Sequence, residues 1–230
     1  MLAEFRHGLR VAVGLSAIRE ANFAFSMIIK PRQLAQLKRE VLEGKCAVML
    51  NGAGELERIA PVLVIRIEWT AGDILVQLAK WNLTEFVASC ALPGSKMLRG
   101  ETPEVAVLRV LEERLGPIGP YVKLGHMQCK SRQSKSQTTA ITTTYLRTIY
   151  HAELDPSFAG VEDAHGVVWP KVAHAKLSHC SVFALNAKDG DADSKVLYTW
   201  MSETLFTWLT SPDGRDIIQR YVALLNIHTG

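Results

Sequence analysis

One capped helix, set between two groups of strand-like segments, constrains the fold of this 230-residue chain most strongly. Thr102 suits the N-cap, Pro103 suits the first helical position, and Gly116 followed by Pro117 ends the segment. Four apolar residues recur at helical spacing and are expected to form its buried stripe: Val105, Leu108, Leu111 and Leu115. The sequence therefore predicts a helix over residues 103–115.

β-Branched and aromatic residues are concentrated on both sides of this helix. Residues 62–69 and 74–81 are typical of a hairpin, and residues 86–91 of a third strand. Two more strands are expected after the helix, over residues 121–129 and 138–153. This order predicts an α/β fold in which a mixed β-sheet is sandwiched by helices.

Further helices are expected near both ends of the chain. Pro31 opens a helical pattern that Gly44 ends, and two C-terminal helices are expected over residues 196–209 and 212–225. We expect three parts: an N-terminal extension of residues 1–58, a central domain of residues 59–185, and a C-terminal helical segment of residues 186–230 packed on it.

Charge is uneven along the chain although the net charge is only +3. Residues 117–152 hold five Lys or Arg and no Asp or Glu. Within them, residues 130–137 are polar and are expected to form an exposed loop, because turn-forming residues alternate with charges. Lys130, Arg132 and Lys135 are candidates for contact with phosphate or RNA. No aromatic side chain interleaves with these charges, so base stacking is not indicated there.

The cysteines and the hydrophobicity pattern bear on the cellular compartment. The four cysteines lie far apart without a CxxC pair, so we expect them to be reduced, in an intracellular and reducing environment: Cys46, Cys90, Cys129 and Cys180. Three arginines near the N-terminus favour a mitochondrial over a cytoplasmic location slightly, although acids interrupt them. No run of 18 apolar residues occurs, and no membrane span is expected.

Residues 92–117 resemble the Nudix box, which that family writes as G-x5-E-x7-R-E-U-x-E-E-x-G-U, where U is aliphatic. Five of nine positions agree: Glu101, Arg109, Leu111, Glu113 and Gly116. Four positions differ: Ser95 and Val110 stand at a glycine and a glutamate, Arg114 at a glutamate, and Pro117 at an aliphatic residue. The resemblance covers about residues 60–185 and implies a Nudix-like fold for them.

The same resemblance implies a diphosphate hydrolase that uses Mg²⁺ or Mn²⁺, but the metal-ligand positions are degenerate. The family places three glutamates at positions that are here Val110, Glu113 and Arg114. A hard cation needs oxygen ligands, which Val110 lacks, and the Arg114 guanidinium repels it. Glu112 lies about 100° around the helix from Glu113 and does not replace the missing carboxylate. We therefore expect no metal and no cofactor at this site.

Other roles are expected for the remaining box residues. By resemblance, Glu101 and Arg109 are expected to hold the loop against the helix, or to face a ligand. Lys96, Arg99 and Arg114 are candidates for a basic pocket that binds phosphate without cleaving it.

Weaker patterns elsewhere favour ordinary structural roles. The run Asp189-x-Asp191-x-Asp193 lacks the later calcium ligands and is expected to be a solvated loop. His174 and His179 lack a full zinc ligand set. Aromatic residues in the C-terminal segment are expected in the core: Trp200, Phe206 and Trp208.

Three functional hypotheses remain open. The first is a non-catalytic Nudix-like module that binds protein, RNA or a nucleotide-like ligand, or serves as a scaffold in a larger assembly. Its plan is similar to that of the Nudix-fold protein of the mitochondrial ribosome's large subunit, including the segment His165–Trp169. The second is an active hydrolase that uses Glu113 and Glu112 with Mg²⁺ or Mn²⁺, helped by Glu153, Glu162 or Asp163. The third is an unrelated α/β domain.

Overall fold

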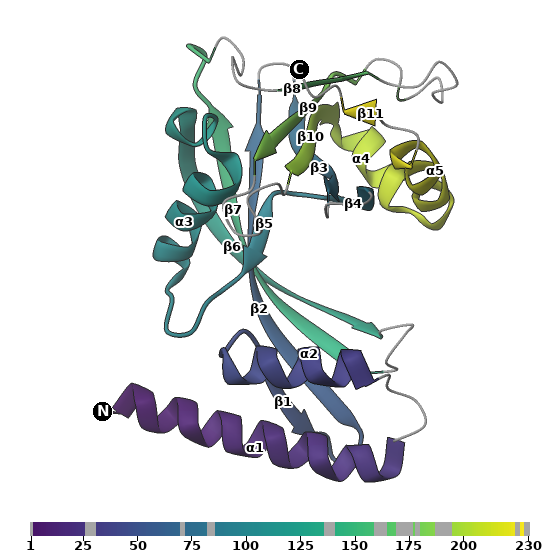
Figure 1. Ribbon diagram of the computed structural model, residues 1–230. Helices are drawn as coiled ribbons and strands as arrows, with labels where there is room; N and C mark the ends of the chain where they lie inside the picture. Colours follow the sequence, from purple (N-terminus) through teal and green to yellow (C-terminus); the bar gives the residue numbers. More distant parts are fainter. Residues whose placement is uncertain are drawn as a thin grey trace. The chain divides into compact units, whose positions relative to one another are not determined.

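The computed structural model describes most of the chain (Figure 1). The described residues are 2–25, 31–69, 72–81, 86–135, 141–158, 165–168, 177, 180–186, 195–223 and 226–227.

The described chain has two helices near each end and one helix between two groups of strands. The helices are α1 (Leu2–Phe25), α2 (Pro31–Leu42), α3 (Pro103–Leu115), α4 (Glu203–Thr210) and α5 (Pro212–Val222), with one 3-10 turn at Gly119–Tyr121. The strands are β1 (Ala47–Leu50), β2 (Leu56–Glu68), β3 (Asp73–Trp81), β4 (Phe86–Ala91), β5 (Gly94–Lys96), β6 (Val122–Lys135), β7 (Thr142–Leu154), β8 (His165–Val168), β9 (Val182–Asn186), β10 (Lys195–Ser202) and β11 (Asn226–Ile227). The predicted α/β class, a mixed sheet flanked by helices, is confirmed.

The strands follow the order β11-β8-β9-β10-β3-β2-β7-β6, with β1 and β5 paired to β2 and β4 paired to β3. The predicted hairpin of β2 and β3 is confirmed, because Glu68 and Ile74 are antiparallel partners. β4 pairs antiparallel with β3, from Trp81 opposite Phe86 to Gln77 opposite Ala91. The chain therefore builds the centre of the sheet from the hairpin that the sequence predicts.

The chain divides into two compact units, each made of separate segments. Unit 1 comprises residues 1–63, 95–106 and 128–149, and unit 2 comprises residues 64–94, 107–127 and 150–230. The strands β2, β6 and β7 and the helix α3 contribute residues to both units.

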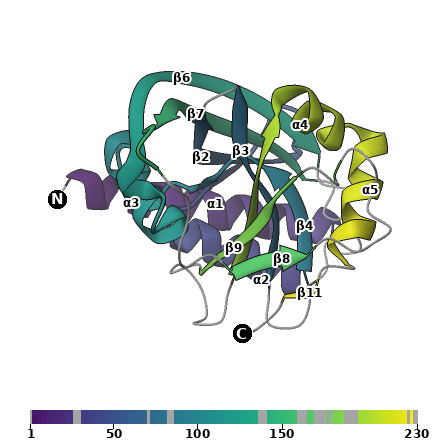
Figure 2. The same ribbon diagram turned by 90° about the horizontal axis from the view of Figure 1, so that it is seen from above.

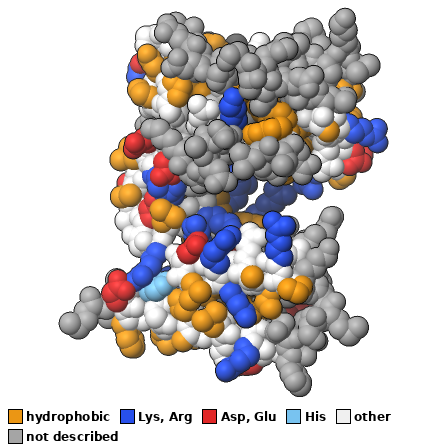
Figure 3. All heavy atoms as spheres, viewed as in Figure 1, with side chains coloured by type: hydrophobic (Ala, Val, Ile, Leu, Met, Phe, Trp, Pro, Cys, Tyr) orange, Lys and Arg blue, Asp and Glu red, His pale blue; other side chains and the backbone are white. Residues whose placement is uncertain are grey.

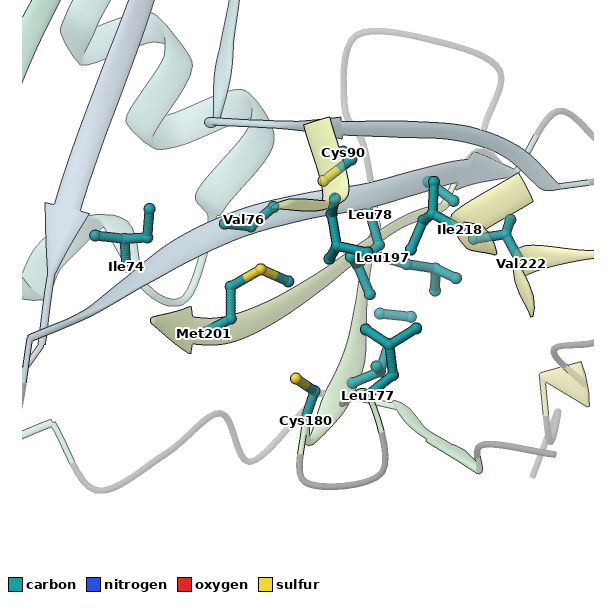
Figure 4. Close-up of a cluster of buried hydrophobic side chains, with 14 residues drawn as sticks. Ile74, Val76, Leu78, Cys90, Leu177, Cys180, Leu197, Met201, Ile218 and Val222 are labelled. Atoms are coloured by element: carbon teal, nitrogen blue, oxygen red, sulfur yellow. The ribbon is translucent and has the colours of Figure 1, made fainter. Parts of the chain in front are cut away.

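The core of unit 2 lies between its sheet and the C-terminal helices. Val76 and Leu78 of β3 and Leu197 of β10 pack with Ile218 and Val222 of α5, and all five are buried (Figure 4). Within this unit, α4 and α5 lie on one side of the sheet and the C-terminal turns of α3 on the other (Figures 1 and 2). Phe206 and Trp208 pack against this core as predicted. Trp200 packs on Trp69, with ring centroids 5.1 Å apart.

The core of unit 1 joins the first two helices to the strands. Buried side chains from α1, α2, β1, β2 and the start of β7 form it: Ala17, Ile18, Leu37, Val41, Cys46, Val48, Leu56, Ala60 and Ile141. The predicted helix from Pro31 is confirmed as α2. The long helix α1 lies in a stretch for which the sequence analysis predicted no helix, because its apolar residues do not follow a single stripe.

A buried ion network ties α2 to two strands of unit 1. The Glu40 carboxylate forms ion pairs with Arg58 of β2 and, at 2.5 Å, with Lys96 of β5. The Glu40 and Arg58 side chains are only 10% and 14% exposed. Burial alone would raise the pKa of Glu40, but hydrogen bonds and charges from Lys96 and Arg58 outweigh it and hold that pKa below the ordinary value of 4.5.

Three expectations about secondary structure are wrong. Residues 196–202 form the strand β10 rather than a helix, because β-branched and aromatic side chains pair with β3 at the centre of the sheet. The segment from Lys130 to Lys135 belongs to β6 and is not a loop. Polar residues occupy this strand because β6 lies at the end of the strand order, where side chains meet water.

The third wrong expectation concerns the buried stripe of α3. Val105 and Leu108 are 56% and 62% exposed, whereas Val107 and Val110 are buried. Apolar residues occupy more than one face of this helix, and packing selects the face centred on Val107 and Val110.

Two other expectations concern cysteines and membranes. Each of the four cysteines is free, with Cys129 exposed and the others buried. Burial raises the pKa of Cys90 to about 12, so its thiol stays protonated at neutral pH. Among the described residues, no helix is long and apolar enough to cross a membrane.

We expect Glu40→Gln to lower the free energy of unfolding at pH 7 by about 3 kcal/mol, because it leaves two half-buried cations without their shared carboxylate. The pKa of Glu40 is lowered in the fold, so its stabilisation is present above about pH 4.5 and is lost as the pH falls through the lowered value. Urea unfolding of both proteins at decreasing pH measures this. The difference between wild type and variant should shrink in acid.

Glu43→Gln is the matched control, because Glu43 is exposed and its one ion pair among the described residues is with Lys45. It should leave unfolding nearly unchanged. Equal losses in the two variants would contradict the structural role assigned to Glu40.

Candidate functional site

The loop before α3 is closed by its own backbone and by Glu101. The Leu98 N–H donates to the Glu101 carboxylate at 2.7 Å, and the Glu101 N–H donates to the Leu98 carbonyl at 3.2 Å. Gly100 between them has a φ of 71°, a left-handed conformation that glycine adopts without strain. Glu101 thus closes this loop on itself, and its bracing of the loop against the helix stays a prediction.

Thr102 begins α3 as predicted. Its carbonyl accepts from the Ala106 N–H at 2.9 Å, and its hydroxyl accepts from the Val105 N–H at 3.5 Å. A hydrogen bond to its own backbone N–H, and one from Thr102, lower the pKa of Glu104. An ionised carboxylate in the first turn also suits the positive end of the helix dipole.

Val110 and Arg114, which stand at glutamate positions of the resemblance, lie on the buried face of α3. Val110 is completely buried, and Arg114 is 8% exposed one turn later. Val107, Leu111 and Leu115 lie on the same face and are also buried. The Arg114 carbonyl accepts a hydrogen bond from the buried Tyr198 hydroxyl at 3.4 Å. This face therefore serves packing in unit 2.

The retained box carboxylate is engaged by a cation from its own helix. Arg109 donates to Glu113 across one turn, at 3.1 Å, and the two side chains are 17% and 32% exposed. The neighbouring Glu112 is exposed. Within the described part of the chain, no three His, Cys, Asp or Glu residues are grouped so as to hold a metal ion. Whether Arg109 also braces the loop through Glu101 stays a prediction.

The other predicted ligand residues have different surroundings. Lys96 pairs with Glu40, and Arg99 pairs with Glu4 of α1. Lys130 and Arg132 are exposed on β6, and Lys135 ends that strand. A common pocket of Lys96, Arg99 and Arg114 stays a prediction.

The sequence analysis missed Glu40 and Arg58. Glu40 follows Leu37 by three residues and precedes Val41, so it lies on the apolar face of α2. A charged residue on such a face needs a partner of opposite charge, and Arg58 supplies it. This pattern was available in the sequence, but the identity of the partner was not.

Several candidate residues fall outside the described part of the chain. They are Glu162, Asp163, His174, His179 and the acidic run from Asp189 to Asp193. Glu153, another carboxylate considered for hydrolysis, is exposed on β7.

Comparison with known proteins gives structural matches of low similarity. No protein-family model and no curated protein matches the chain. A crystal structure of a Nudix hydrolase from M. smegmatis, RenU, matches with 18% identity and a TM-score of 0.27, over 41% of this chain and 59% of that chain. A structure of MutT, from work on the fish pathogen Aliivibrio salmonicida and on Vibrio cholerae, matches with 12% identity and a TM-score of 0.33, over 72% of this chain and 98% of that chain. Both TM-scores lie below 0.5, and the function proposed below rests on this chain's own residues.

We expect Val110→Ala to lower the free energy of unfolding by about 2 kcal/mol, because it removes buried methyl groups. Glu113→Gln should cost about 0.5 kcal/mol or less, because it removes only a partly exposed pair across one helical turn. Urea unfolding of the two variants measures the difference. A larger loss for Glu113→Gln would mean that Glu113, rather than Val110, supports the fold.

Proposed function

We propose that the chain is a non-catalytic Nudix-like module that acts by binding, as a subunit of a larger assembly. The observation that supports this most is the place of Val110 and Arg114 on the buried face of α3. Both stand where the family has metal-ligand glutamates.

The chemistry of these positions argues against metal-dependent hydrolysis. Mg²⁺ and Mn²⁺ take oxygen ligands, and neither an aliphatic side chain nor a guanidinium supplies one. Glu113 is the one glutamate that remains of the three, and Arg109 already neutralises its charge. A cation would have to displace that arginine and bind beside a second, Arg114.

The exposure of two carboxylates supports the hydrolase alternative. Glu112 is exposed and Glu113 is about one third exposed, so both carboxylates are accessible to an ion from solvent. Such a site would depend on further carboxylates outside the box. It would bind Mg²⁺ or Mn²⁺ and cleave diphosphate-linked nucleosides.

Exposed apolar side chains support a role in an assembly. Val105 and Leu108 of α3 are 56% and 62% exposed, and Phe5 and Leu9 of α1 are 70% and 57% exposed. Each pair lies one helical turn apart, so a partner could bury both of its side chains together. Given the similarity of plan noted above, we propose the mitochondrial ribosome's large subunit as the first assembly to test.

The test measures, by chromatography, the nucleoside monophosphate formed from a panel of nucleoside diphosphate-linked compounds with Mg²⁺ or Mn²⁺, for wild type and Glu113→Gln. We expect no divalent-dependent turnover in wild type above the level of the variant. Circular dichroism of both samples controls for folding. Turnover that Glu113→Gln abolishes would establish the hydrolase alternative instead.

A further inference from the structure

The two structural units carry charges of opposite sign, which the net charge of the chain conceals. The residues of unit 1 include 15 Lys and Arg against 8 Asp and Glu, a net charge of +7. Those of unit 2 include 11 against 15, a net charge of −4. Together these give the +3 of the whole chain. A local excess of this size attracts polyanions even when the whole molecule is nearly neutral.

Every carboxylate of unit 1 already has a partner inside that unit. Three of them engage four cations: Glu4 with Arg99, Glu40 with Arg58 and Lys96, and Glu43 with Lys45. The other five accept hydrogen bonds from neutral groups: Glu20 from Ser16, Glu55 from Asn51, Glu57 from Gln133 and Thr144, Glu101 from Leu98, and Glu104 from Thr102. These five carboxylates keep their negative charge, and the net charge of +7 already counts them.

Nine cations of unit 1 form no ion pair with any described residue. They are Arg6, Arg10 and Arg19 of α1, Arg32, Lys38 and Arg39 of α2, Lys130 and Arg132 of β6, and Arg147 of β7. Figure 3 shows Lys and Arg side chains over the face of unit 1 that carries α2, with few Asp or Glu among them.

Three of these unpaired cations lie on the neighbouring strands β6 and β7. Lys130 and Arg132 lie two residues apart, so they project from the same face of an edge strand whose residues Gln128–Ser134 are all exposed. Burial lowers the pKa of Arg147, and the nearby charge of Arg132 lowers it further. Two like charges in proximity favour an anion that lies between them.

We propose that unit 1 binds the phosphate backbone of a nucleic acid, with Lys130, Arg132 and Arg147 as the central contacts. Guanidinium groups form paired hydrogen bonds with phosphate oxygens, which gives arginine its preference for such ligands. A repeating polyanion can contact Lys130, Arg132 and Arg147 with successive phosphates, which a single phosphate cannot. No aromatic side chain interleaves with Lys130 and Arg132, so the binding is independent of sequence.

The inference rests on the binding role proposed above, and its test is separate from the hydrolysis assay. Fluorescence anisotropy measures the Kd of the full chain for a labelled single-stranded RNA of about 30 nucleotides and for a DNA duplex of the same length, over a range of salt. The RNA and DNA arms identify which nucleic acid is preferred. The central variant is Lys130→Ala/Arg132→Ala/Arg147→Ala.

We expect the triple variant to bind roughly tenfold more weakly at about 0.1 M salt, with a slope of log K against log salt smaller by about 2. The matched control removes three cations from unit 2, Lys195→Ala/Arg215→Ala/Arg220→Ala, and should leave Kd within about twofold. If the triple variant does not fold, the single variant Arg132→Glu replaces it, because it changes one exposed residue. This variant should also weaken binding.

Three outcomes would overturn the proposal. They are the absence of binding to either nucleic acid by folded protein, a Kd that the triple variant and Arg132→Glu leave unchanged, and an equal loss in the unit 2 control. Binding of poly-glutamate that the triple variant abolishes, without binding of RNA or DNA, would assign the surface to an acidic protein instead.

Discussion

The burial of one face of α3 is the constraint on which the rest of this interpretation depends. Helical periodicity places residues 107, 110, 111, 114 and 115 on one side of the helix, and packing in unit 2 covers that side. A position cannot serve both as core and as an exposed metal ligand. Val110 and Arg114 therefore contribute to the packing of unit 2, and the loop before α3 is closed by Glu101.

Positive and negative charge is separated between the two structural units, each of which is made of several segments of the sequence. In unit 1 the carboxylates are used internally, above all Glu40, which takes two cations in a half-buried site. The nine cations named above form no ion pair with the described residues, and all of them except Arg147 are exposed. Unit 2 has the opposite balance. Unit 1 by itself therefore attracts polyanions, and unit 2 by itself repels them.

Local patterns predicted local structure well and burial less well. The capped helix α3 and the hairpin of β2 and β3 were predictable because turn residues and caps mark their ends. The buried face of α3 was not, because apolar residues at 105, 107, 108, 110 and 111 satisfy two stripes and only the neighbouring strands select one. β10 was mistaken for a helix because a short apolar run fits both structures until its partner β3 is known. Of the site, the box residues were predictable, whereas the pairing of Glu40 with Arg58 depends on contacts distant in sequence.

The division of unit 1 into three chain segments has a consequence during synthesis. Its helices and the residues Leu56 and Ala60 emerge from the ribosome about 80 residues before Ile141, which completes the same core. At roughly 5–20 residues per second, that delay is about 4–16 s. During this time the core of unit 1 lacks Ile141, so part of its apolar surface stays open to solvent until β7 is made.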